Sequence, residues 1–571
     1  MLYKDLYLKM AAEVEEHQGP GGADEVKPYK IHFSSKYLDL TKQKLETTRL
    51  PHELSEPKSK DWWEPKSHVE PLIDFWLEQY SWRTQEDLLN TELPQFRTEF
   101  SIPSSEAHIR VHFIHAHSPH TNAIPLLLIP PFPFSSLSFG HLIKLFTEPE
   151  DPAHTQPFHL VIPSLPGIAF SDALPNNTPV ISSTADILDS LMSRLSYPHY
   201  LVTNASSGAA SPAEIDFKLV NHLINHHSGS CLGAHLISPP LAKPKLREAP
   251  VEWAKWSIAS LFHAPILGYR SEDFSALERN GYVRTSGKAP TPAQLGLNQL
   301  SLREPNTLSY ALCDSPTGLL VFILKTLHLL SPRKKFTPTE VINLTQLAWL
   351  PGPESALRFW AHCVRHPEQV EKKVTSKPKV GITVFLGDKP SAEESTEAAA
   401  EADELVLDET KDSYICPSWA NAKYKVVYAN RASGRSGLLA WERPEIIAAG
   451  IRGVAASILK SDPRLRPSPA PATTPLEQVV VPSDIGASEQ PVSPQTKPTP
   501  TLLAPLTPPP TIQERGHPHR AISGDTAVAS SESVAGGARS PTLEVPSPAH
   551  LAPPTENTAV EQPDDEGQQP R

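Results

Sequence analysis

The chain has 571 residues, of which 39% are hydrophobic and 20% charged, and its formal net charge is −12 at pH 7. This length exceeds one compact core and predicts two or three globular units plus tails, while the low apolar share and 62 prolines predict partial disorder. Nothing in this charge balance indicates the concentrated basic face that a nucleic-acid-binding groove requires, so we expect no nucleic-acid partner.

The N-terminal residues 1–26 are rich in charge and contain no apolar run long enough for a signal peptide or a membrane anchor. We expect a flexible N-terminus, and no later segment reaches membrane-spanning length. The four cysteines are widely spaced and form no Cys-x-x-Cys pair, which argues against a zinc site or a disulfide framework. We therefore expect a cytoplasmic protein without a metal or a cofactor.

Strands and helices alternate through the middle of the chain. Helices are expected at 138–149, 184–195 and 444–459, where apolar residues recur with helical spacing. Continuous apolar strands alternating with helices predict a mostly parallel sheet that is covered on both faces. The expected strands are 109–117, 125–131, 158–166, 199–205, 231–240, 379–389 and 422–432.

Three longer segments interrupt or follow this pattern. The mostly helical stretch 241–378 separates two late strands and predicts a cap over the carboxyl edge of the sheet, where open α/β sheets place their sites. Residues 391–413 are acidic and rich in alanine, which indicates a loop insertion. Residues 461–571 contain no Phe, Tyr, Trp or Cys and predict a disordered proline-rich tail, or alternatively a docking segment for a proline-recognising protein.

Several motifs occur in an order that resembles the microsomal-type epoxide hydrolases over about residues 27–460. The resemblance implies an α/β-hydrolase fold with an N-terminal region at 27–105, core segments at 106–240 and 379–460, and the cap between them. The motifs are Tyr80-x-Trp82-Arg83-x-x-Glu86-x-x-Leu89-Asn90, then Pro94-Gln95-Phe96, PSLPGIAFSD (163–172), CPSWA (416–420) and LLAWERPE (438–445).

Members of that family open epoxides with an aspartate nucleophile, and a histidine oriented by a carboxylate then activates the water that hydrolyses the ester. The resemblance places the nucleophile at Ser206 and the histidine at Gly437, so this chain lacks both family residues. The run Asn204-Ala205-Ser206-Ser207-Gly208 is close to a serine hydrolase elbow. The alternative for Ser206 is a turn serine that caps the following helix.

The other family positions are partly kept. The resemblance implies that Asp388 is the orienting carboxylate and Tyr282 the first cap tyrosine, whereas Trp360 replaces the second. The oxyanion loop has also changed, since Pro131 and Phe134 replace glycines. The main-chain amides of Phe132 and Ser207 are the expected oxyanion donors.

Three hypotheses follow. The first is a homologue with impaired or absent catalysis that binds a small apolar ligand or a protein, because Ser206 attack on an epoxide would leave an ether that water cannot hydrolyse as it does an ester. The second is an active hydrolase, either a divergent epoxide hydrolase or an esterase that depends on Ser206. The third is an interaction protein that acts through the proline-rich tail.

Overall fold

The computed structural model describes residues 25–52, 64–102, 107–176, 178–207, 214–280, 304–330, 334–365, 376–387 and 414–466. Two of the expected site residues, Tyr282 and Asp388, lie outside these residues, as do the acidic segment 391–413 and the tail from residue 467 onward.

A nine-stranded sheet runs through the described part of the chain in the order β1-β2-β3-β5-β4-β6-β7-β8-β9. The six strands from β5 to β9 in this order are mutually parallel, and β1, β2 and β3 add to one edge in antiparallel fashion. This confirms the mostly parallel α/β-hydrolase sheet. The strands are β1 (Lys27–Pro28), β2 (Gln95–Ser101), β3 (His108–Ala116), β4 (Ile124–Ile129), β5 (Phe158–Pro163), β6 (Tyr200–Asn204), β7 (Cys231–Ile237), β8 (Lys379–Phe385) and β9 (Lys425–Ala432).

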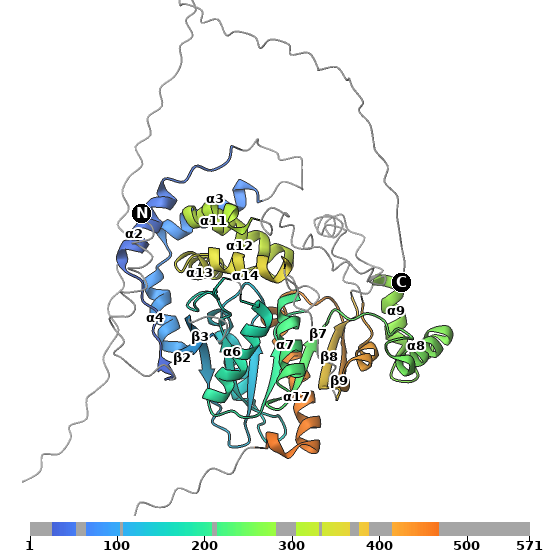
Figure 1. Ribbon diagram of the computed structural model, residues 1–571. Helices are drawn as coiled ribbons and strands as arrows, with labels where there is room; N and C mark the ends of the chain where they lie inside the picture. The colour runs from blue at the N-terminus through green and yellow to red at the C-terminus, as the bar shows by residue number, and fades with distance from the viewer. Residues whose placement is uncertain are drawn as a thin grey trace, which may run out of the picture. The chain divides into compact units, whose positions relative to one another are not determined.

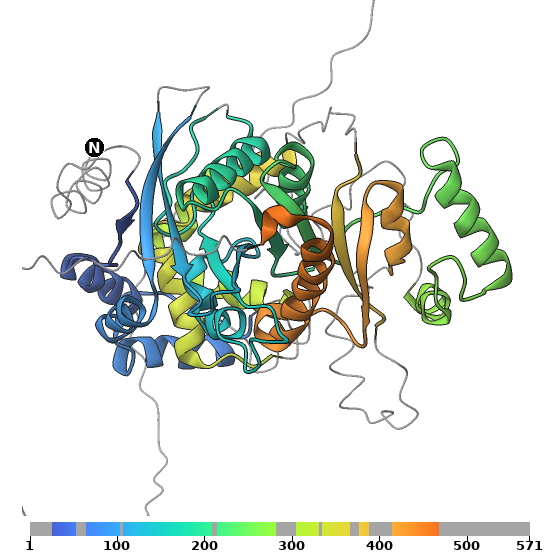
Figure 2. The same ribbon diagram turned by 90° about the horizontal axis from the view of Figure 1, so that it is seen from below.

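Successive residues of the central strands enter different cores on the two faces of the sheet. Leu127 and Ile129 of β4 pack in the core that holds α6 and α7, while Leu126 and Leu128 pack in the core that holds α17. This alternation explains why the strands read as unbroken apolar runs, since both faces are buried. Figures 1 and 2 show helices on both faces.

Two of the three predicted covering helices, at 184–195 and 444–459, are confirmed, the third differs, and the helix at Ile215–His226 was not predicted. α6 (Val180–Arg194), α7 (Ile215–His226) and α17 (Pro444–Ser461) flank the sheet. The single helix expected at 138–149 is instead a 3-10 helix, η1 (Ser136–Leu142), followed by the short α5 (Ile143–Thr147). Phe139 has non-helical dihedral angles there, and Leu93 lies 2.5 Å from where a β-carbon on Gly140 would stand, so the segment bends where its glycine meets Leu93.

Among the described residues, six helices lie between β7 and β8 in the chain, which confirms the expected helical insertion between late strands. They do not form one group: α11 to α14 lie together above the sheet in Figure 1, while α8 and α9 lie beyond β9 at the other edge in both views. The helices are α8 (Pro250–Phe262), α9 (Ser271–Asn280), α11 (Pro305–Asp314), α12 (Pro316–Leu330), α13 (Pro338–Trp349) and α14 (Glu354–Arg365).

The N-terminal helices α2 (Ser35–Glu46), α3 (Lys66–Glu78) and α4 (Trp82–Glu92) pack beside the cap helices. Side chains of the Tyr80–Asn90 motif hold the extended segment before α2. Glu86 accepts the amide N–H of Phe33 at 2.8 Å, and Asn90 exchanges two hydrogen bonds with the backbone of Ile31 at 2.7 and 2.8 Å. The motif is therefore an anchor for the N-terminal segment in this structure.

Among the described residues, no single helix is long and apolar enough to cross a membrane. The bent pair Pro305–Asp314 and Pro316–His328 meets the length and composition criteria only when its two helices are taken together.

Candidate functional site

Ser206, the expected nucleophile position, lies in the turn that follows β6, at the carboxyl edge of the parallel strands. Asn204 ends the strand, and its side-chain amide donates to the carbonyl of Ser206 at 2.5 Å and accepts the amide N–H of Ile237 at 3.3 Å. Asn204 thus ties the turn to β7, which gives a structural reason for a residue larger than the small one that this elbow normally carries. Ser206 is half-buried and Ser207 is buried.

The side chain of Ser206 is engaged by a buried carboxylate. Its hydroxyl donates to Asp216 Oδ2 at 2.5 Å, and the other oxygen, Oδ1, accepts the amide N–H of Phe132 at 3.3 Å. Asp216 therefore bridges the expected nucleophile and one of the two expected oxyanion donors. A carboxylate in this place occupies the amide that an oxyanion would need.

Asp216 was not predicted from the sequence. It stands in the first turn of α7 and its side chain has no solvent exposure. The available signal was its position on the apolar stripe of that helix, at the spacing of Val220 and Leu223, both of which are fully buried. A charged residue on such a stripe must find hydrogen-bonding partners inside the protein, because an unpaired buried charge is costly.

Gly437, where the sequence predicts the position of the family histidine, has a backbone conformation that disfavours a side chain. Gly437 has a φ of +56°, and a β-carbon built on it would stand 2.6 Å from a carboxylate oxygen of Glu442. That carboxylate accepts the amide N–H of Leu438 at 3.0 Å, which holds it over the glycine. Within the described residues, no histidine is hydrogen-bonded to Ser206.

Of the two expected cap-tyrosine positions, the structure describes only the second, Trp360, because Tyr282 lies outside the described residues. Trp360, on α14, is buried, and its ring centroid lies 6.2 Å from that of Phe132. Phe359 stacks on the same Phe132 ring at 6.0 Å.

Asp388 also lies outside the described residues, but its neighbour Gly387 donates its amide N–H to the carbonyl of Gly434 at 3.1 Å, which brings the loops after β8 and β9 side by side.

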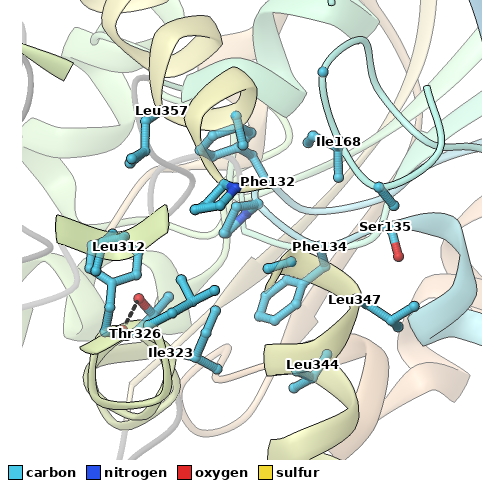
Figure 3. Close-up of a pocket in the computed structure, with 18 of the residues that line it drawn as sticks. Phe132, Phe134, Ser135, Ile168, Leu312, Ile323, Thr326, Leu344, Leu347 and Leu357 are labelled. Carbon is cyan, nitrogen blue, oxygen red and sulfur yellow. Dashed lines mark hydrogen bonds between the residues drawn. The ribbon is translucent and has the colours of Figure 1, made fainter. Parts of the chain in front are cut away.

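A largely apolar cavity lies between the loop after β4 and the cap helices (Figure 3). It has about 850 Å³ of empty volume, its opening to solvent included, and none of the described residues that line it is ionisable. Phe132 and Phe134 form its floor on the core side, and Leu312, Ile323 and Leu344 come from three cap helices. Neither Ser206 nor Asp216 lines the cavity, although Phe132 touches both sites.

Two hydrogen-bonding groups of the cavity lining have no partner among the described residues. The Ser135 hydroxyl and the Trp360 indole N–H are both buried without a hydrogen bond. By contrast, the hydroxyl of Thr326, another polar residue of the lining, already donates to the carbonyl of Phe322 at 2.9 Å within its helix. Because buried polar groups are normally satisfied, the first two are suited to an oxygen atom carried by an otherwise apolar ligand.

Comparisons with known proteins give a consistent result. Residues 26–139 match the family model described as "Epoxide hydrolase N terminus". A protein of Stigmatella aurantiaca that is named as an epoxide hydrolase is 28% identical over 59% of this chain and 69% of its own length. Epoxide hydrolase 1 of Sus scrofa is 23% identical over 76% of this chain and 90% of its own length. The crystal structure of juvenile hormone epoxide hydrolase from the silkworm Bombyx mori, 20% identical, matches with a TM-score of 0.56 over 79% of this chain and 97% of that one, which shows the shared fold.

Proposed function

This chain is an α/β-hydrolase homologue of the epoxide hydrolase family, and from that premise we propose that it binds a small apolar ligand beneath the cap helices and does not turn over epoxides. The observation that carries this proposal is the Asp216 carboxylate, which is bound at once to the Ser206 hydroxyl and to the Phe132 amide. Catalysis at Ser206 would require both of these groups to be available to a substrate.

The conformation of Gly437 supports the same proposal. A histidine general base at this position would need a left-handed backbone and a displaced Glu442 carboxylate. Without a base, a serine hydroxyl is a weak nucleophile. An ether formed by Ser206 attack on an epoxide would also have no carbonyl at which water could release it.

The chemistry of the cavity favours a ligand that broadly resembles an epoxide, the class of compound for which the relatives are named. Its described lining is mainly aliphatic and aromatic, with two unpaired hydrogen-bonding groups, Ser135 and Trp360. We infer an apolar molecule that carries an acceptor oxygen, such as an ether, epoxide or ester oxygen. We further propose a cytoplasmic location, because the four cysteines, all of which lie in the described residues, form no disulfide bond.

Binding is tested by titrating the purified full chain with Nile red and with an aliphatic epoxide, following the fluorescence of the dye and its displacement. Ala348→Phe, which fills the cavity, is expected to weaken binding at least tenfold. Leu88→Phe, at a surface position 46% exposed, is the matched control and is expected to bind as the parent chain does. Equal binding by both variants would place the ligand elsewhere.

A second candidate function is favoured by the short Ser206–Asp216 contact. Here Asp216 would accept the Ser206 proton and support ester hydrolysis, supplying a base that is not evident in the sequence. The test is turnover of aryl and alkyl epoxides and p-nitrophenyl esters by the full chain beside Ser206→Ala and Asp216→Asn. Identical background rates would support the ligand-binding protein, whereas ester turnover lost in both variants would establish this hydrolase and refute the first proposal.

A further function for the segment 461–571 rests on its composition alone. The proline-rich tail is proposed to dock a protein that recognises extended proline motifs. If a chain that lacks these residues still binds every protein partner of the full chain, this proposal is refuted.

A further inference from the structure

A cluster of imidazole and carboxylate groups lies between the helices α6 and α7, outside their buried apolar faces. Asp186 lies on α6 and His222 on α7, and His227 is the C-cap residue that directly follows α7. One potential ligand atom from each of these residues lies within 4.8 Å of the other two. Asp186 is exposed and both histidines are half-buried, so solvent ions can reach the cluster.

His227 is held in an orientation typical of a metal-bound histidine. Its Nδ1 lies 3.1 Å from Asp189 Oδ2, and its Nε2 points to Asp186 Oδ1 at 2.9 Å. Asp189 is itself fixed, since its Oδ1 accepts the hydroxyls of Tyr200 at 2.9 Å and Ser230 at 2.5 Å. A carboxylate that orients one ring nitrogen leaves the other available to a metal, and this arrangement recurs around protein zinc sites.

We propose that Asp186, His222 and His227 form a binding site for Zn²⁺ or a similar borderline divalent ion, with Asp189 orienting His227 from behind. Two imidazole nitrogens and one carboxylate oxygen suit zinc, with water as the fourth ligand, and do not suit Mg²⁺ or Ca²⁺, which prefer oxygen ligands only. Zinc would displace the proton shared by His227 Nε2 and Asp186. This site contains no cysteine, so it differs from the zinc sites built on Cys-x-x-Cys pairs, which the sequence lacks.

The cluster needs only a small rearrangement to bind the ion. Ligand atoms about 2.0–2.2 Å from a tetrahedral zinc stand roughly 3.3–3.6 Å apart, closer than the 4.8 Å limit that the cluster meets. The Asp186 side chain is 64% exposed and can rotate to close this gap. His222 is also supported by His226, one helical turn later, whose ring stacks on it with centroids 4.0 Å apart.

The competing explanation is a metal-free ion pair, in which a protonated His227 bridges the carboxylates of Asp186 and Asp189. The two explanations differ in what added zinc does. An ion pair gains nothing from the metal, whereas a site binds one equivalent and stabilises the fold in proportion to its occupancy.

The experiment uses the full chain, freed of metal with a chelator and titrated with ZnCl2 by calorimetry. One equivalent is expected to bind at micromolar or lower concentration, and Asp186→Asn and His222→Ala are each expected to weaken it at least tenfold. His154→Ala is the matched control, because His154 also pairs with a carboxylate, Asp151 at 2.8 Å, but belongs to no such cluster in the described residues. Binding to the parent chain that none of the cluster variants changes, or no binding at all, would overturn the proposal.

A second readout follows the ligands directly. Co²⁺ is expected to give the intense visible absorption of a tetrahedral centre in the parent chain and in His154→Ala, and to lose it in His222→Ala. Asp189→Asn keeps all three ligands and is expected to retain the absorption while weakening zinc binding by about 10–100-fold, as outer-shell partners do. Octahedral cobalt spectra in every variant would argue for nonspecific binding and against the site.

Discussion

At the scale of single residues, Gly437 combines two constraints that the sequence does not reveal. Its φ of +56° belongs to the left-handed region, and the Glu442 carboxylate fills the space where a β-carbon would stand. We expect Gly437→Ala to lower the free energy of unfolding by about 1–2 kcal/mol, because a side chain is strained in that region. Urea unfolding measures the effect. Gly229→Ala is the control, since no atom lies within 4 Å of its β-carbon position, and an equal loss in both variants would contradict the argument.

A fully buried histidine on β7 makes stability depend on pH. His235 lies between the hydroxyls of Thr203 at 3.1 Å and Thr383 at 2.8 Å, and burial lowers its pKa to about 3. The unfolded chain binds a proton at this histidine below about pH 6.5, whereas the folded chain does not until about pH 3. Between these two pH values only the unfolded chain binds the proton, so protonation stabilises the unfolded state. The free energy of unfolding therefore decreases as the pH falls through this window.

We expect His235→Asn to flatten this part of the pH profile by up to about 1.4 kcal/mol per pH unit. The measurement is urea unfolding of both proteins between pH 7.5 and 4.5. The variant loses packing as well, so its stability is lower throughout, and the slope is the relevant quantity. Parallel profiles for the two proteins would show that His235 is not the titrating group.

At the scale of elements, a buried ion pair attaches α9 to the edge of the sheet. Arg431 of β9 donates to both oxygens of Asp273, at 2.7 and 2.8 Å, and Tyr414 donates to Oδ1 of the same carboxylate at 2.5 Å. Both members of the pair are almost fully buried. The pair explains how α8 and α9, which lie apart from the cap helices, are held against β9.

We expect Arg431→Ala to destabilise the protein by about 3–5 kcal/mol, because it leaves the Asp273 carboxylate buried without its cation. Arg464→Ala removes an ion pair to Asp462 from a position 48% exposed and is expected to cost less than about 1 kcal/mol. Thermal and urea unfolding of both variants test the difference. Similar losses would mean that burial does not distinguish the two pairs.

The elements differ in how far the sequence predicts them. The parallel strands were predicted to within a few residues, because burial on both faces makes them continuous apolar runs. β2, which lies between β1 and β3 near one edge of the sheet, was missed, since Arg97, Thr98 and Glu99 interrupt any such run. The division of the segment 241–378 into two separate groups of helices depends on long-range contacts such as Arg431–Asp273, and no local pattern encodes them.

The candidate site shows the same limit. Alignment of motifs placed Ser206 in the turn after β6 and Phe132 in the loop after β4, at the positions where the structure has them. It did not place Asp216 between them, because that contact joins a loop and a helix through the fold.

At the scale of the whole molecule, the described residues suggest where the folded part ends. Leu465, in η6 (Pro463–Leu465), is 2% exposed and packs in the same core as α17, which covers one face of the sheet. The sequence beyond it contains no aromatic residue that could extend this core. We therefore expect a chain that ends at Arg466 to unfold within about 0.5 kcal/mol of the full chain, as a surface change would.

The matched truncation ends four residues before Leu465, at Ser461, and removes that side chain together with η6. It is expected to cost about 2–3 kcal/mol, the free energy of burying one leucine. Urea unfolding of the two truncated chains measures the difference, and Nile red titration of the longer one tests whether the cavity is kept. If the chain ending at Arg466 were as unstable as the shorter one, the residues after it would contribute to the fold, and the composition of the tail would be a poor guide to its role.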